Sequence, residues 1–183
     1  MVFGMSVAEI DLELHRVERA VRLLDELRPR TEGKGEVYRA VMLDLEGRAA
    51  LERGRYWEAL ELLEASLRTW SALKGEDGLN YASSLKYRSL TLQALGRLDQ
   101  AIAGLEETAR IQERQDAVEQ LARTRFLLAR ALWGIPARRA ESVRLAESAL
   151  EGTKIAVRRR EVVAWLRARP PLGERDFAPT FAR

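Results

Sequence analysis

The chain has 183 residues, of which 46% are hydrophobic and 32% are charged, and its formal net charge at pH 7 is +3. It contains no cysteine, which excludes a disulfide framework and a thiolate metal site. Its apolar runs are far shorter than the roughly 20 residues that span a bilayer, so we expect a cytoplasmic protein.

The first predicted element is a helix over residues 6–28. Ser6 and Glu9 have the spacing of a capping box. The apolar residues that follow recur on one helical stripe, which indicates a single amphipathic helix. Residues 29–35 then form a loop. Its Gly33-Lys34-Gly35 lacks the spacing of a phosphate-binding loop and the Ser or Thr after the lysine, so we do not predict nucleotide binding.

The centre of the chain repeats itself with a period of 42 residues. Gly54 and Gly96 correspond, and the register continues through the pairs Ala59/Ala101, Leu63/Leu105 and Ser66/Thr108. Each glycine follows a run with helical apolar spacing, where a left-handed backbone conformation ends a helix at little cost. A fixed period of this kind predicts stacked helical hairpins. We expect these hairpins over residues 36–73, 79–115 and, in a divergent copy, 117–151.

A further helix is predicted over residues 154–169, with Val162 and Trp165 among its apolar residues. Such a helix would cap the last hairpin, as the end of a helical stack requires. Pro170 and Pro171 prevent its continuation. The tail over residues 170–183 is either flexible or a linear motif built on Phe177 and Phe181.

The repeated pattern resembles the tetratricopeptide repeat family, in a long form of about 42 residues that occurs in bacterial signalling and adaptor proteins. The resemblance covers roughly residues 36–152. It implies an all-α fold, a right-handed α-solenoid of stacked antiparallel helical hairpins with about eight helices, which we expect to form one domain over residues 6–169. The residues that carry the pattern are Gly47, Gly54, Tyr56, Ala59 and Leu63, then Ser89, Gly96, Leu98, Ala101 and Leu105.

Catalytic chemistry finds little support in the sequence. His15 is the only histidine, which excludes a His-rich metal site and leaves any catalytic triad dependent on that one residue. We interpret it as a partly solvated surface residue. Carboxylates such as Glu106-Glu107 and Glu76-Asp77 are adjacent in sequence on expected solvent-facing or linker positions, which is not the arrangement of a paired acid and base. We therefore expect no enzyme activity, no cofactor and no metal.

The resemblance implies a concave groove lined by the first helix of each hairpin. In this groove the charged positions comprise four cations and one anion, among apolar spots, which suits a protein or peptide ligand with acidic groups. The alternative is that the cations only solvate this face. Chaperone tails are not expected ligands, because the places where the family has the lysines and asparagines that grip them hold Asp44, Arg48, Lys86 and Leu90 here. The groove residues are Val41, Asp44, Arg48, Leu51, Ser83, Lys86, Leu90, Gln93, Arg123, Phe126 and Arg130.

Charge is unevenly distributed along the chain. Residues 1–120 contain 17 Lys and Arg against 22 Asp and Glu, whereas residues 121–183 contain 14 against 6. Our leading hypothesis is a scaffold or adaptor that binds a partner in the groove, with a regulatory role in bacterial signalling as its narrower version. One alternative is binding of nucleic acid or another acidic partner by a basic end that includes Arg158, Arg159 and Arg160. Another is a homo-oligomer joined acidic face to basic end.

Overall fold

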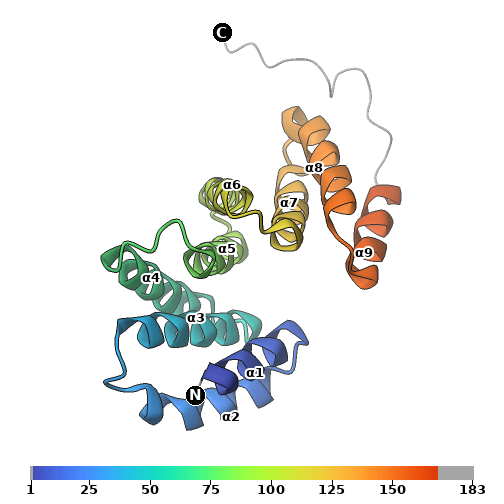
Figure 1. Ribbon diagram of the computed structural model, residues 1–183. Helices are drawn as coiled ribbons and strands as arrows, with labels where there is room; N and C mark the ends of the chain where they lie inside the picture. Colours follow the sequence, from blue (N-terminus) through green and yellow to red (C-terminus); the bar gives the residue numbers. More distant parts are fainter. Residues whose placement is uncertain (1, 169–183) are drawn as a thin grey trace. The chain divides into compact units, whose positions relative to one another are not determined.

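The computed structural model describes residues 2–168, and within them it contains nine α-helices, one short 3-10 helix and no strand (Figure 1). This confirms the predicted all-α fold of helical hairpins. The tail with Phe177 and Phe181 lies outside the described residues. The helices are α1 (Val2–Glu13), α2 (Val17–Thr31), α3 (Glu36–Glu52), α4 (Tyr56–Ala72), α5 (Leu79–Ala94), α6 (Leu98–Arg114), α7 (Val118–Leu132), η1 (Pro136–Arg138), α8 (Arg139–Gly152) and α9 (Ala156–Arg167).

The chain divides into two compact units, Met1–Gly104 and Leu105–Arg183, which we call unit 1 and unit 2. The boundary falls within α6. The expected single domain over residues 6–169 therefore stays a prediction, and each unit is described by itself. Over residues 2–168, none of the helices has the length and apolarity that crossing a bilayer requires.

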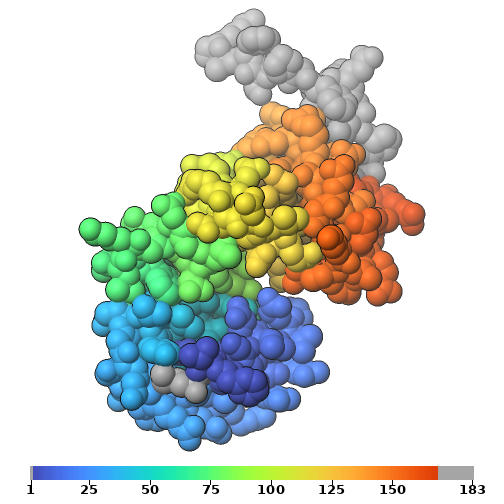
Figure 2. All heavy atoms as spheres, in the orientation of Figure 1, coloured from blue at the N-terminus to red at the C-terminus, as the bar shows by residue number. Residues whose placement is uncertain are grey.

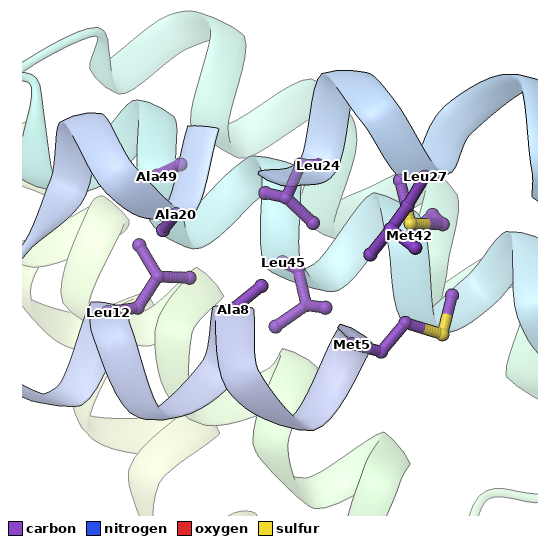
Figure 3. Packing of buried hydrophobic residues seen from close by; sticks show 9 residues of the cluster. All are labelled: Met5, Ala8, Leu12, Ala20, Leu24, Leu27, Met42, Leu45 and Ala49. Atoms are coloured by element: carbon purple, nitrogen blue, oxygen red, sulfur yellow. The ribbon is translucent and has the colours of Figure 1, made fainter. Parts of the chain in front are cut away.

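The core of unit 1 begins where α1 and α2 pack on α3 (Figure 3). Met5, Ala8 and Leu12 recur at helical spacing on α1 and point toward side chains of the other two helices. Leu24 on α2 and Leu45 on α3 are each 2% exposed at this junction. Burial of a leucine side chain contributes about 1.5–3 kcal/mol, so α1 and α2 form a hairpin that is held to α3 by apolar contact.

The expected single helix over residues 6–28 is wrong, because the chain turns between α1 and α2. His15 has a φ of 55°. The N–H of Arg16 donates to the carbonyl of Asp11 (2.7 Å), and that of His15 donates to Leu12 (3.0 Å). These two bonds are the Schellman motif that ends many helices, with His15 where glycine is usual. Ser6 does not cap a helix: it lies inside α1, and its Oγ donates to the carbonyl of Val2 (3.3 Å).

The same ending recurs after α3, α4, α5 and α6. In each case two backbone N–H groups donate to carbonyls three and five residues earlier, and the first of the two donors has a positive φ. The predicted glycine endings are confirmed, with φ of 73° at Gly54 and 76° at Gly96. The other two positions hold Lys74 and Asp116, with φ of 54° and 51°.

The two helices of the α3–α4 hairpin approach closely because α3 carries a glycine at the contact. A Cβ added to Gly47 would lie 2.7 Å from Cγ of Leu63 on α4. A polar seam continues from this hairpin to α5. The Oγ of Ser66 donates to the carbonyl of Ala40 (2.8 Å) and lies 3.0 Å from the Oγ of Ser84. These bonds satisfy hydroxyl groups that are fully buried between the helices.

In unit 2, α7 and α8 form a hairpin and α9 packs against it. Phe126 and Val162 belong to its buried cluster. The Trp165 ring on α9 contacts Phe126 and Trp133 edge to face, with centroids 5.8 Å and 5.7 Å apart. The start of α9 is further held by Glu119 of α7, which accepts hydrogen bonds from three groups: the Thr153 hydroxyl, the Lys154 N–H and the Arg158 guanidinium.

Candidate functional site

The residues predicted to line one groove lie in two groups. Those of α3 and α5, from Val41 to Gln93, belong to unit 1, and those of α7, from Arg123 to Arg130, belong to unit 2. The groove as a whole stays a prediction. Within unit 1, however, several of the predicted side chains come together around one point.

That point is a polar cluster between α3 and α5, which we call the α3–α5 cluster: Asp44, Arg48, Ser84, Lys86 and Tyr87. The Ser84 hydroxyl donates to Asp44 (2.8 Å), and Arg48 lies 3.7 Å from the other oxygen of Asp44. The Arg48 guanidinium and the Lys86 ammonium each lie 4.4 Å from the centroid of the Tyr87 ring. Two cations therefore gather on one aromatic ring.

Three members of the cluster, Asp44, Arg48 and Lys86, are among the predicted groove residues, whereas Ser84 and Tyr87 are not. Glu9 of α1, whose carboxylate accepts a hydrogen bond from Arg48 (3.1 Å), is not among them either. Tyr87 directly follows the predicted Lys86, and the helical spacing that selects the groove positions does not include it. Glu9 was assigned to a helix cap. Because the first helix was predicted to begin at residue 6 and to continue to residue 28, the contact between Glu9 and Arg48 could not be predicted.

The cluster is much less exposed than a solvated groove stripe. The exposed fractions are 2% for Arg48, 7% for Asp44 and 9% for Lys86. Glu9 is the exposed member of the Arg48 ion pair, with 52% of its side chain accessible. The physical reason is that α1 packs on α3 and brings Glu9 over Arg48, while Tyr87 stacks against it from α5.

Burial shapes the electrostatics of the cluster. It raises the pKa of Asp44, against the opposing effects of the Arg48 charge and the Ser84 hydrogen bond. Burial also opposes the charge of Arg48, but Tyr87, Asp44 and Glu9 outweigh burial, and the pKa of Arg48 is raised. Among the described residues, no group accepts a hydrogen bond from Nε of Arg48. The guanidinium therefore keeps one unused donor, at a position where polar groups normally find partners.

Apolar side chains border the cluster. Leu51 and Leu90 are half-buried and pack against the group that contains Tyr87. Val41 and Ser83 are also half-buried, and Gln93 is exposed. The predicted combination of apolar spots and cations is thus present on the α3 and α5 side of unit 1, with the cations deeper than expected.

The predicted residues of α7 have three different environments. Phe126 is 6% exposed and belongs to the core of unit 2, where α9 covers it. Arg130 is exposed, lies 3.6 Å from Glu161 and has its guanidinium 5.9 Å from the centroid of the Phe126 ring. Arg123 is half-buried. Phe126 is therefore a packing residue in this unit.

The basic end is largely occupied by contacts within unit 2. Arg158 binds Glu119 (3.0 Å), and Arg159 donates to the carbonyls of Leu150 and Thr153. Arg160 is exposed. Two of the three arginines thus fasten α9 to the preceding hairpin, which leaves a smaller basic surface than the sequence suggested.

The loop with Gly33 and Gly35 borders a cavity of about 520 Å³ in unit 1. Its charged lining residues are the arginines Arg28 and Arg39 and the carboxylates Glu32, Glu36 and Glu46. Both arginines are paired with carboxylates of this same lining, Glu46 and Glu36. This lining does not favour a phosphate group, in agreement with the sequence.

Antiparallel hairpins that follow each other along the chain, each with a close helix–helix contact, define an α-helical repeat protein. The sequence pattern of the tetratricopeptide repeat family matches residues 38–114. Residues 38–114 therefore carry tetratricopeptide repeats, whose fold is in general a scaffold for protein–protein interaction. The matched stretch includes α3, α4, α5 and α6 almost entirely, and thus the α3–α5 cluster.

Solved structures show the same fold. One is a kinesin light chain protein from Podosopora anserina with nearly identical TPR-like repeats, at 22% identity and a TM-score of 0.67 over 89% of this chain and 82% of that one. A single-substitution variant of that protein matches equally well and is covered over 81%. BtubC (BKLC) from P. vanneervenii matches at 14% identity and a TM-score of 0.60, over 98% and 86% of the two chains. No curated protein matches the sequence.

Proposed function

We propose that the chain is a non-enzymatic scaffold that binds an extended segment of a partner protein on the α3 and α5 side of unit 1. The observation that carries this proposal is the α3–α5 cluster, in which Arg48 and Lys86 share the Tyr87 ring beside half-exposed leucines. Charged groups so deep in a helical stack are costly unless they are paired. A face that retains them is suited to a ligand that supplies carboxylates.

The expected ligand is an acidic peptide with a few apolar side chains. Glu9 already occupies one side of Arg48 with an exposed carboxylate, and a ligand carboxylate that displaces Glu9 can form the same kind of charge-assisted bond. Leu51 and Leu90 offer apolar contacts next to it. Ser83 and Gln93 offer hydrogen-bonding groups for an extended backbone.

In unit 2, exposed Arg130 and half-buried Arg123 provide a second place for acidic groups on α7. We place such a scaffold in the cytoplasm, as a regulatory or adaptor segment of a bacterial signalling system. The arginines of α9 do not favour the nucleic-acid alternative, because Arg158 and Arg159 are already engaged.

The test is a selection of random peptides on the immobilised chain, followed by titration of the enriched peptides by fluorescence anisotropy. We expect acidic peptides with apolar anchors, and a loss of affinity of about tenfold, or 1.4 kcal/mol, in Lys86→Met. This variant keeps the apolar stem and removes the charge. Lys34→Met, the same change at an exposed loop residue, is the matched control. Equal binding by Lys86→Met and the parent, with circular dichroism unchanged, would reject this face as the site.

A further inference from the structure

Helix α1 has two apolar faces. The inner face, with Met5, Ala8 and Leu12, is buried against α2 and α3. The outer face carries Phe3 and Ile10, which are 82% and 55% exposed. An amphipathic surface helix normally places polar residues opposite its buried stripe. On α1 the side opposite the buried stripe is apolar instead.

The outer residues form one narrow stripe. Phe3, Val7, Ile10 and Leu14 follow each other at intervals of four, three and four residues, which is the spacing of a coiled-coil seam. Leu14 follows the last residue of α1, but its N–H still donates to the carbonyl of Ile10 (3.0 Å), so it continues the helical turn. At 3.6 residues per turn, this stripe lies opposite the buried one.

Within the described part of unit 1 most of the stripe is uncovered: Val7 is half-buried, but Leu14 is 52% exposed, and α1 contributes to the visible surface of this unit in Figure 2. A stack of helical hairpins presents a polar face where it meets water. A contiguous apolar stripe on a soluble unit indicates a contact surface.

We propose that a second copy of this chain covers the stripe, with the two α1 helices packed antiparallel around a twofold axis. In that arrangement Phe3 of each copy meets Leu14 of the other, and Val7 meets Ile10. The large side chains meet at the two ends and the β-branched ones meet at the centre. The same patch is then complementary to itself, as a twofold interface requires.

The charges beside the stripe agree with this arrangement. Ser6 and Glu13 flank it on one side, and Gly4 and Asp11 flank it on the other. Antiparallel packing places Glu13 opposite Ser6 and near the positive end of the other helix, so no like charges meet. Asp11 is already bound by Arg19 (3.0 Å). Parallel packing would instead align the two helix dipoles and bring Phe3 against Phe3.

This surface is separate from the α3–α5 cluster. Glu9, which binds Arg48, lies off the stripe on another side of α1. Substitutions in the stripe therefore test the dimer without touching the proposed ligand site, and the two proposals can fail independently. With four side chains from each copy, the interface is at the small end of specific interfaces, for which we expect a Kd on the order of micromolar.

The first test is sedimentation equilibrium of the full chain, from about 1 µM to about 500 µM. We expect the mass to rise from 20.8 kDa toward twice that value. Ile10→Glu and, separately, Phe3→Ser should hold the mass at that of one chain, since both residues are exposed and neither supports the core. Val157→Glu, at an apolar residue of α9 that is 63% exposed, is the control and should still dimerise. A single-chain mass throughout, or a dimer that survives Ile10→Glu and Phe3→Ser, overturns the proposal.

The second test uses the absence of native cysteine. Phe3→Cys and Leu14→Cys chains are mixed and oxidised at the highest concentration of the first test, because each substitution weakens the pair. A mixed pair keeps one of its two Phe3–Leu14 contacts, and the disulfide-linked species are identified by mass. The two positions are about 16 Å apart along a helix. Antiparallel packing places the two thiols of a mixed pair next to each other, which raises their effective concentration. We therefore expect at least roughly a tenfold excess of the disulfide between Phe3→Cys and Leu14→Cys chains over the disulfide between two identical chains. An excess of Phe3→Cys pairs would overturn the antiparallel arrangement.

Discussion

Single residues decide how five of the helices end. His15, Lys74 and Asp116 adopt a left-handed conformation that Gly54 and Gly96 adopt at the equivalent points of other hairpins. This conformation costs a residue with a Cβ roughly 1–2 kcal/mol. The chain tolerates it because each position completes the same pair of backbone hydrogen bonds.

Replacing Lys74 with glycine should therefore stabilise the protein. We expect the free energy of unfolding to rise by about 0.5–1 kcal/mol, because relief of the left-handed strain exceeds the entropy that glycine adds to the unfolded chain. Urea titration followed by circular dichroism measures this change. The reverse substitution, Gly96→Ala, should lower the free energy by about 1 kcal/mol, since its Cβ meets open space and only the backbone is strained. A decrease for Lys74→Gly would show that the lysine side chain compensates for the strain.

Glu119 makes the stability of unit 2 depend on pH. Burial alone would raise the pKa of this carboxyl, but hydrogen bonds from Thr153, Lys154 and Arg158 outweigh burial and lower it. A carboxyl with a lowered pKa in the folded state stabilises the protein above its unfolded pKa of about 4.3. That stabilisation is lost as the pH falls through the folded pKa.

We expect Glu119→Gln to lower the free energy of unfolding by about 1–2 kcal/mol at pH 7. The difference from the parent should shrink as the pH falls from about 5 to about 3. Urea titrations of both chains over this range measure it. Glu147→Gln, at an exposed position of α8, is the control. A difference that does not change with pH would mean that Glu119 acts through packing and not through its charge.

At the scale of helices, the closest contact in the α3–α4 hairpin depends on Gly47. Alanine is the better helix former by about 1 kcal/mol, yet its Cβ would lie 2.7 Å from Cγ of Leu63. We expect Gly47→Ala to lower the free energy of unfolding by about 1–3 kcal/mol, because overpacking outweighs helix propensity. Thermal unfolding measures the loss. Gly134→Ala, where a Cβ would meet nothing within 4 Å, is the matched control and should change little.

The 42-residue repeat predicted the helices of the central hairpins within a few residues, because its glycines and apolar spacing are direct signals of helix ends and buried faces. The turn after α1 gave no such signal, since His15 is neither glycine nor proline. The burial of Arg48 could not be predicted from the sequence either. It depends on Glu9, 39 residues away, and on the packing of α1 against α3. The spacing of residues within one helix does not predict such a contact between helices.

At the scale of the molecule, unit 1 and unit 2 each have a core of their own. In helical repeats, stability is carried by contacts between neighbouring elements. A cavity in one unit should therefore loosen that unit first, and local opening is visible as faster amide exchange.

We expect Leu63→Ala, at a fully buried residue of unit 1, to cost about 2–5 kcal/mol. Hydrogen exchange followed by mass spectrometry should then accelerate in α3 to α5 more than in α7 to α9. Val162→Ala, at a buried residue of α9, should give the opposite pattern. Equal acceleration in both units for both variants would show that the chain opens as one cooperative body.

The edge-to-face contact between Trp133 and Trp165 gives unit 2 an optical signature. Two indole rings with centroids 5.7 Å apart are close enough for their electronic transitions to couple. Such coupling produces paired bands of opposite sign in circular dichroism, which vanish when the rings separate. Undocking of α9 should thus be observable by its own spectral change while the helical signal of the remaining chain is still intact.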